Sequence, residues 1–499
     1  MSNNMECKHR LKSKGKLFTI IRCIIVLVLI TINTMALAQQ EEEYGTGLLF
    51  DSINTRSIPQ HAALTKDSYR GLPSSVSYEQ YCPQAGNQGK FGTCVGFATA
   101  YSLRTTLYVK AMREAGYTAN PNDHLFSPSF IYEQIKFADD KDCSKGSYVS
   151  DALELLQYIG VATLKTMPYQ CGTTISEASL TESANYKIVS YQQLFSIKDT
   201  DADFRVLMMK KALSEGNPCL FSFKTTKSFK TSRGTDLWKQ QKDDQEPGDI
   251  KMGHAMCLVG YDDNKYGGSF RVLNSWGTGW GDKGFIWIPY RDLAKYTYQC
   301  FQVQGEKIKP KKVDPVIVKP EIKGTIRFQQ NTGESMNASL LSFSLAEGLP
   351  TYRMNANYTS GTRFRFYMNT STDAYIYAFA SDFSGKINQI FPYDAHISPL
   401  LGKNSTVAFP SETKVIRMDE SKGTDYLLIL YSKKPLTQSS ILQQLQQAQG
   451  GFVSKVKTSL KNNFISSHLI NYVKDQIAFE LKADSNADIL PILIEIPHY

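Results

Sequence analysis

The sequence predicts an α+β fold, made of a helical part and a strand part, followed by a β-rich C-terminal domain. Helical patterns dominate from Leu72 to about Asn217, and short apolar runs typical of strands follow. Helices first and strands second is the signature of an α+β domain. A chain of 499 residues is also too long for one ordinary hydrophobic core, which favours a second domain.

Composition along the chain gives the domain boundaries. Residues 72–306 form the α+β domain. Residues 307–321 place Pro310, Pro315 and Pro320 among lysines, which predicts a stiff, extended linker. Residues 322–499 form the β-rich accessory domain.

Two helices are predicted in the first part of the α+β domain. One covers residues 93–115, with Thr93 as its N-cap, and its apolar residues leave little polar surface. That composition indicates a central, largely buried helix. A second helix covers residues 148–158, with Ser147 or Ser150 as its cap.

Short apolar runs bounded by Gly, Asp and Asn predict the strands. In the α+β domain they are Cys219–Phe223, Ala255–Val259, Ser269–Leu273 and Phe285–Ile288. In the accessory domain they are Thr362–Met368, Ala374–Ala380 and Tyr426–Tyr431, followed by a glutamine-rich helix around Ser439–Gln449 and an apolar run over Ile489–Ile496. Aromatic residues that alternate along these runs are interpreted as core packing.

Residues 1–38 have the pattern of a secretory signal peptide. A basic segment precedes the apolar run Cys23–Ile32, and Ala36-Leu37-Ala38 offers a cleavage site before Gln39. The alternative is an uncleaved N-terminal anchor. We expect an exported protein (periplasmic, cell-surface or secreted) with no integral membrane domain after cleavage. Residues 39–71 are then a leader or short pro-segment, whose length predicts partial inhibition at most.

The charge balance does not favour nucleic acid as a partner. Residues 1–22 contain six Lys or Arg and one Glu, so +5 of the formal net charge of +9 lies in the predicted signal peptide. The remaining +4 forms no basic patch in the sequence.

The cysteines of the mature chain are odd in number, which suggests one free thiol in an oxidising compartment. Cys94 is the candidate for this free thiol. Cys219 and Cys257 lie in apolar strand-like runs and are predicted to be buried thiols. Cys143 and Cys171 are the pair that we favour for a disulfide.

Four residues supply the chemistry of a thiol hydrolase. Cys94, in the first turn of a helix, is favoured as a thiolate by the exposed N–H groups there. His254 precedes a strand and can face Cys94 as the base, while Asn274 can orient the imidazole. The side-chain N–H of Gln88 beside the backbone N–H of Cys94 would form an oxyanion hole. Two tryptophans, at 276 and 280, can shield the His–Asn hydrogen bond.

These motifs resemble those of the papain-like cysteine peptidases over Leu72–Val303. The similarity rests on Asn87-Gln88-Gly89 followed by Gly92-x-Cys94, on Gly253-His254-Ala255, and on Asn274-Ser275-Trp276-Gly277-Thr278-Gly279-Trp280-Gly281. It implies a papain-like fold with a helical left and a β-barrel-like right subdomain, and a cleft between them. It implies Cys94, His254, Asn274 and Gln88 as catalytic residues.

The resemblance also suggests which residues bind substrate. Asp142-Cys143-Ser144-Lys145-Gly146 is similar to the glycine-bearing loop of the family's cleft. The substrate-binding candidates are Lys145, Gly146, Gly253 and Trp276. Lys145 stands where the family often has glycine, and we predict that it narrows the cleft or favours acidic side chains.

The chain departs from the family pattern in other places as well, including Gly253, where several family members carry a polar residue. Phe91 replaces a disulfide-forming cysteine, and Val95 replaces the tryptophan that usually follows the nucleophile. Residues 227–249, rich in Lys, Gln and Asp, form an insertion between Cys94 and His254. None of these departures removes a catalytic group.

The function predicted from the sequence is an exported cysteine endopeptidase that acts on polypeptides and needs no metal or organic cofactor. One alternative is a cysteine aminopeptidase, or an amidase or transpeptidase that acts on cell-wall peptides. Another is a papain-like binding scaffold without catalysis. The C-terminal half resembles an uncharacterised bacterial β-domain often attached to exported peptidases and kinases, and a protein or cell-envelope partner for it is left open.

Overall fold

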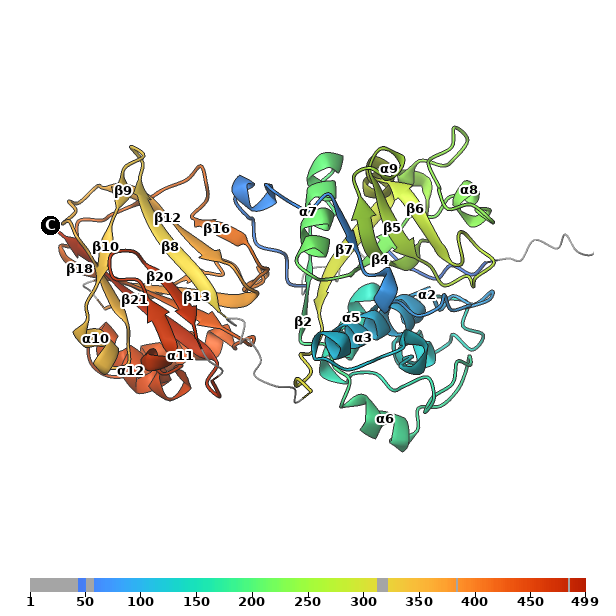
Figure 1. The fold of residues 1–499 in the computed structure, drawn as a ribbon, viewed down its shortest axis with the longest axis horizontal. Coiled ribbons are helices and arrows are strands. Elements are labelled where there is room, and N and C mark those ends of the chain that lie inside the picture. Colours follow the sequence, from blue (N-terminus) through green and yellow to red (C-terminus); the bar gives the residue numbers. More distant parts are fainter. Residues whose placement is uncertain (1–43, 51–57, 312–321, 383–384, 483–484) are drawn as a thin grey trace, which may run out of the picture. The chain divides into compact units, whose positions relative to one another are not determined.

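The computed structural model describes residues 44–50, 58–311, 322–382, 385–482 and 485–499 (Figure 1). Gly45–Tyr499 form one compact unit. The predicted signal peptide and most of the predicted linker lie outside the described residues. None of the helices within the described ranges has the length and apolar character needed to cross a membrane.

The predicted central helix is present as a continuous helical stretch. It consists of α2 (Cys94–Gly96), the π-helical segment η4 (Phe97–Arg104) and α3 (Thr105–Glu114). Thr93 is the N-cap residue, as predicted, but it makes no side-chain capping bond, and its hydroxyl instead bonds to the Tyr169 hydroxyl at 2.8 Å. The hydroxyl thus bonds to a side chain that is distant in sequence rather than to a backbone N–H group in the first turn of the helix.

The second predicted helix is α5 (Val149–Tyr158). Its N-cap position is Tyr148 and has no side-chain capping bond, so the prediction of Ser147 or Ser150 as the cap is wrong. The other helical elements of this domain, and η2 in the leader, have no counterpart among the predicted helices. They are η2 (Lys66–Tyr69), η3 (Glu79–Tyr81), η5 (Pro121–Asp123), α4 (Pro128–Ile135), α6 (Glu177–Ser183), α7 (Ala202–Ser214), α8 (Lys227–Lys230), η6 (Pro247–Asp249), η7 (Lys265–Gly267) and α9 (Tyr290–Tyr296).

Within the described residues, seven strands form the sheet of the α+β domain, in the order β2-β7-β3-β4-β5-β6 with β1 paired to β4. Their bounds are β1 (Ser75–Ser77), β2 (Ser190–Gln193), β3 (Cys219–Phe223), β4 (His254–Asp262), β5 (Ser269–Leu273), β6 (Phe285–Pro289) and β7 (Thr297–Gln304). All four predicted strands are present. Because β4 and β5 are antiparallel neighbours, the start of β4 lies beside the end of β5. This topology brings His254 next to Asn274.

The C-terminal domain contains two sheets, each of seven strands among the described residues. One has the order β10-β11-β21-β18-β13-β14 with β15 on β13, and the other has the order β16-β12-β8-β20-β19 with β17 on β12 and β9 on β8. The strands are β8 (Lys323–Gln330), β9 (Ser335–Met336), β10 (Ala338–Leu340), β11 (Thr351–Met354), β12 (Arg363–Thr370), β13 (Ala374–Ser381), β14 (Ile387–Phe391), β15 (Leu400–Leu401), β16 (Ser405–Phe409), β17 (Ile416–Arg417), β18 (Gly423–Ser432), β19 (Ile470–Tyr472), β20 (Ala478–Leu481) and β21 (Ile489–His498).

Alternation along these strands builds the two cores of the C-terminal domain. On β13, Ile376 and Ala378 face a core shared by both sheets, to which Phe366 of β12 also belongs. Tyr375 and Tyr377 face the opposite way, into a core closed by helices (Figure 1). Those helices are α11 (Gln438–Gln447) and α12 (Phe452–Leu460), and α10 (Phe343–Ala346) lies near the same end. The predicted strands, the glutamine-rich helix and the core role of the alternating aromatics are confirmed.

Candidate active site

Cys94 is the first residue of α2 and is fully buried. Burial raises the pKa of its thiol to about 11, although backbone N–H groups of Ala255, Gly47 and Val95 lie against the sulfur and oppose this shift. Ala255 directly follows His254 on β4. The nucleophile candidate on the helical side and the imidazole on the sheet side are therefore brought together.

The imidazole of His254 is held on one side by Asn274. Nε2 lies 2.6 Å from Oδ1 of Asn274, whose Oδ1 also accepts from the backbone N–H of Ser275 at 2.7 Å. The Asn274 oxygen is thus fixed, and the bond makes Nε2 the protonated nitrogen in the neutral ring. Nδ1 is buried without a hydrogen-bond partner among the described residues. Burial lowers the pKa of His254 to about 3, so the ring is neutral in this state.

Trp276 covers the imidazole as the sequence predicts. Its ring stacks on His254 with a centroid distance of 4.4 Å and an interplanar angle of 25°. Trp280 then packs edge-on against Trp276 at 5.3 Å. Both indoles are buried, and they exclude water from the side of the ring that they cover.

Gln88 is fully buried, and both ends of its amide are engaged. Its Oε1 accepts from the Ser275 hydroxyl at 2.6 Å, which orients the group. Its Nε2 donates to the carbonyl oxygens of Phe91 at 2.8 Å and Gly45 at 3.2 Å. The donor predicted for an oxyanion therefore already contacts a carbonyl oxygen of the leader, that of Gly45.

The leader segment Gly45–Leu49 runs between the two walls of the site. Leu48 forms an antiparallel bridge with Gly253 and a parallel bridge with Ser147. Four backbone hydrogen bonds result: Leu48 N to Gly253 O (3.1 Å), Gly253 N to Leu48 O (3.0 Å), Ser147 N to Gly47 O (2.8 Å) and Leu49 N to Ser147 O (3.1 Å). Leu48 itself is 1% exposed. The segment explains why Cys94 and His254 are buried.

Three of the four predicted substrate-binding residues contact this leader segment. Gly253 pairs with Leu48, Trp276 donates its Nε1–H to Gly45 O at 3.0 Å, and Gly146 lies so close that a Cβ there would stand 2.1 Å from Gly47 O. The fourth, Lys145, forms an ion pair with Asp139 at 2.5 Å and is about half exposed. The candidates other than Lys145 thus line one channel, which the leader segment occupies.

The structure places a disulfide between Cys143 and Cys171, the pair favoured from the sequence, with a Cα–Cα distance of 6.0 Å. Glu133 lies near both sulfurs, and its Oε1 accepts from Gly172 N at 2.7 Å. The sulfurs are bonded to each other, so this group is a disulfide with a carboxylate neighbour rather than a set of metal ligands. Cys219 and Cys257 are buried free thiols, as predicted.

The inserted segment 227–249 supports the tryptophan pair from behind. The Phe229 ring lies 5.8 Å from Trp276 and 5.0 Å from Trp280, and the Trp280 Nε1–H donates to Phe229 O at 3.2 Å. Trp238, also from the insertion, packs on Phe229 at 5.4 Å. The insertion therefore extends the apolar cover over His254.

Sequence reasoning missed three supporting residues. Ser275 orients Gln88, and its only signal was its place between Asn274 and Trp276. Tyr169 donates to Gln88 O at 3.0 Å and bonds to Thr93, so it braces the loop before the nucleophile. Tyr169 is 76 positions from Thr93, and no local pattern marks it. Phe229 lies in a segment that the sequence marks only by its polar composition.

Comparison with known proteins agrees with this arrangement. Residues 72–304 match the papain family of cysteine proteases, and residues 357–435 match a domain of unknown function, DUF4384. An uncharacterized peptidase C1-like protein of Acanthamoeba polyphaga mimivirus is 29% identical over 219 residues, which are 42% of this chain and 65% of that protein. Pro-cathepsin H of Bos taurus is 25% identical over 250 residues, 48% of this chain and 68% of that protein.

The chain thus spans about two thirds of the length of these curated relatives. Among solved structures, xylellain, a cysteine protease from Xylella fastidiosa, aligns with a TM-score of 0.43 at 22% identity, over 53% of this chain and 96% of that one. With the family match and the placement of Cys94, His254, Asn274 and Gln88 in view, residues 72–304 are a papain family cysteine protease domain, and a separate domain of unknown function, DUF4384, follows it.

Proposed function

We propose that the protein is an exported cysteine endopeptidase, and that the cleft closed by Gly45–Leu49 is its latent form. The observation that carries the proposal is His254, which is bonded to Asn274 through Nε2, stacked under Trp276, and followed by the residue whose N–H contacts the Cys94 sulfur. The Cys143–Cys171 disulfide supports export, since such bonds persist in oxidising compartments.

In the proposed reaction the Cys94 sulfur attacks the carbonyl carbon of the scissile bond. His254 removes the thiol proton through Nδ1 and later delivers it to the leaving amine. The Gln88 Nε2–H and the Cys94 backbone N–H stabilise the oxyanion, and water then hydrolyses the thioester. Asn274 keeps the ring in the tautomer that leaves Nδ1 free for the thiol.

The leader supports endopeptidase over aminopeptidase activity. Gly45 contacts Gln88 and Trp276, Gly47 contacts the Cys94 sulfur, and Leu48 pairs with Gly253. An extended chain therefore has room on both sides of Cys94. An aminopeptidase needs one side closed so that the substrate's N-terminus can be fixed, and the leader passes through without such a barrier.

Replacing Gln88 with Ala is expected to lower kcat/KM by about 10²-fold, the usual loss for one oxyanion donor. The test uses a chain trimmed to begin at Leu72, an unfolded protein as substrate, and identification of the new termini. Gln84→Ala, in the same loop with an exposed side chain, is the control and should leave the rate unchanged. Release of single N-terminal residues only, or hydrolysis of a cell-wall preparation in place of protein, would contradict the endopeptidase assignment.

Replacing Lys145 with Gly is expected to weaken the preference for acidic substrate residues by roughly 2- to 5-fold, as suits a surface charge. The change is small because Asp139 already neutralises part of the ammonium charge. The measurement compares kcat/KM for matched peptides with Asp or Asn at each position near the cleavage point. Lys141→Gly, an exposed lysine of the same loop, is the control. An identical Asp/Asn ratio in Lys145→Gly and the parent chain would rule out a role in specificity.

A further inference from the structure

A second part of the leader, Gln60–Ser68, is bonded to the C-terminal domain. Leu64 forms an antiparallel bridge with Val407 of β16. The Thr65 N–H donates to Thr406 O at 2.8 Å, and the Thr406 N–H donates to the Ser68 hydroxyl at 2.9 Å. In the described residues β16 stands at the end of its sheet's strand order, so the leader continues that sheet as an added strand.

The contact continues at the beginning of the segment. The Gln60 N–H donates to His396 O at 2.6 Å, and the Ser398 N–H donates to Gln60 O at 2.8 Å. On its other side the segment bonds to Gln193 of β2, through Pro59 O and His61 N, both at 2.8 Å. The leader is thus fixed at several points within a few residues.

Side chains of the segment alternate as a docked strand requires. Ala62 is 1% exposed and belongs to the core between the two sheets of the C-terminal domain. Leu64 packs against the same core, whereas Ala63 between them is exposed. A small apolar side chain is needed at position 62, and position 63 is unconstrained.

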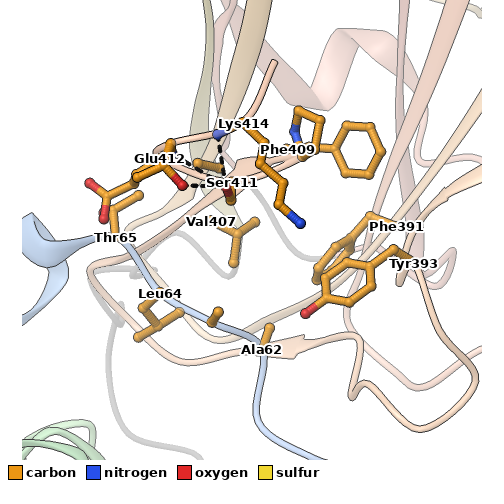
Figure 2. A pocket seen from close by; sticks show the side chains of 14 residues that line it. Ala62, Leu64, Thr65, Phe391, Tyr393, Val407, Phe409, Ser411, Glu412 and Lys414 are labelled. Carbon is orange, nitrogen blue, oxygen red and sulfur yellow. Dashed lines mark hydrogen bonds between the residues drawn. The ribbon is translucent and has the colours of Figure 1, made fainter. Parts of the chain in front are cut away.

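A cavity of about 570 Å³ lies beside the docked strand (Figure 2). Ala62 and Leu64 face it from the leader, while Val407, Phe391 and Tyr393 face it from the C-terminal domain. Leu64 therefore has open space next to it and does not fill its surroundings. Incomplete packing limits how tightly the strand is held, which is compatible with its release.

We propose that the C-terminal domain is a strand-binding module whose occupant is the chain's own leader, and that docking of Gln60–Ser68 helps to hold Gly45–Leu49 in the cleft. The second half of this statement rests on the proposed peptidase function. If the segment is released from both the C-terminal domain and Gln193, Phe50 is tethered through 22 residues to Leu72, whereas with docking it is tethered through 10 residues to Gln60. The effective concentration of a tethered segment falls roughly as the −3/2 power of tether length, which gives a factor of roughly 3.

Docking also fixes the direction of the chain, so we expect loss of docking to raise the fraction of molecules with an open cleft by roughly 3- to 10-fold.

Two adjacent alanines provide the test, in the chain that begins at Gln39. Ala62→Glu places a charge in the sandwich core, and Ala63→Glu places the same charge in solvent. Both changes lie in the leader, outside the strands of either domain.

Amide hydrogen exchange tests the docking without using activity. In Ala62→Glu the amide hydrogens of Thr65 and Thr406 should exchange roughly tenfold faster than in the parent chain, because the hydrogen bonds that protect them open. In Ala63→Glu they should exchange as in the parent chain. Ser68→Ala, which removes one partner of Thr406, should give a smaller increase at Thr406 alone. Parent-like exchange at both amides in Ala62→Glu would overturn the docking.

The rate at which an epoxide cysteine-peptidase inhibitor labels Cys94 tests the coupling to the cleft. Ala62→Glu should raise this rate by roughly 3- to 10-fold, and Ala63→Glu should not change it. Faster exchange in Ala62→Glu with an unchanged labelling rate would overturn the coupling while the docking stands. If Cys94 is not labelled even in a chain that begins at Leu72, the peptidase function fails, and the exchange data still decide the docking.

Discussion

A chain that begins at Leu72 is expected to react at Cys94 on the order of 100-fold faster with an epoxide inhibitor than a chain that begins at Gln39. The leader segment makes five backbone hydrogen bonds, four with Gly253 and Ser147 and one from Gly45 N to Gly89 O at 3.0 Å, and it buries Leu48. Each bond contributes about 0.5–1.5 kcal/mol and a buried leucine about 1.5–3 kcal/mol. After the entropic cost of ordering the segment is subtracted, the closed state is expected to be more stable than the open state by roughly a few kcal/mol. About 2.7 kcal/mol corresponds to a 100-fold excess of the closed state.

This expectation departs from what the leader's length predicts. A leader of 33 residues between Gln39 and Gly71 favours partial inhibition at most. The position of Gly45–Leu49 over Cys94 argues instead for a strong block, because few residues are needed when all of them lie in the cleft. Labelling rates that differ by less than about threefold between the two chains, under 1 kcal/mol, would restore the weaker interpretation.

The pH dependence of labelling separates the closed from the open state. In the closed chain burial raises the pKa of the Cys94 thiol to about 11, so at pH 7 only about one molecule in 10⁴ holds a thiolate. Labelling within the closed cleft would therefore rise about tenfold per pH unit up to about pH 11, whereas labelling through the open state should keep the pH profile of the trimmed chain at a rate lowered by the closed fraction. The neutral His254 cannot offset this, since burial lowers its pKa to about 3. In the trimmed chain a rehydrated imidazolium can stabilise the thiolate, and the profile should be flat near neutral pH.

Two adjacent leucines give a matched control within the leader. Leu48 is buried between Gly253 and Ser147, while Leu49 is only half buried. Leu48→Ala in the chain that begins at Gln39 should raise the labelling rate by roughly 10-fold or more, and Leu49→Ala should have a smaller effect. Equal effects of the two changes would mean that the segment is held by its backbone alone.

The strands and the pairing of His254 with Asn274 were predictable because their signals are local. Apolar runs such as Cys219–Phe223 and Ser269–Leu273 match their strands residue for residue. The motif around Asn274 is recognisable from its own consecutive residues, although its side chains bond to Gln88, Gly45 and Phe229, which are distant in sequence. By contrast, Thr93 is the N-cap residue but makes no side-chain capping bond, because its hydroxyl bonds to Tyr169, a partner supplied by tertiary structure.

The role of the leader could not be predicted for the same physical reason. Gly45–Leu49 and Gln60–Ser68 have no periodic pattern of their own, because they act as single strands on surfaces made by distant parts of the chain. Leu48 needs both Gly253 and Ser147, and Leu64 needs Val407. Edge pairing of this kind depends on backbone groups that every sequence contains, so it leaves almost no trace in residue identity.

Replacing His254 with Ala is expected to lower kcat/KM of the trimmed chain by about 10³- to 10⁴-fold at pH 7. The loss has two parts of roughly 10² each: the thiol returns toward its ordinary pKa of 9.0, so that about 1% is thiolate, and the leaving amine loses its proton donor. The measurement is peptide hydrolysis across pH 5 to 10, with His124→Ala as the control because the His124 ring lies against Tyr108, at a centroid distance of 5.5 Å, and not against Cys94 or His254.

The pH profile distinguishes a catalytic from a merely structural role for His254. If the imidazole acts on the Cys94 thiol, labelling of His254→Ala by the epoxide should rise about tenfold per pH unit and approach the parent rate near pH 9, while hydrolysis stays low. A loss of labelling that persists at high pH, together with a lower thermal midpoint, would instead mean that the change damages packing under Trp276. Asn274→Ala should fall between the parent chain and His254→Ala, since it leaves the base in place but frees the ring from the bond that fixes its tautomer.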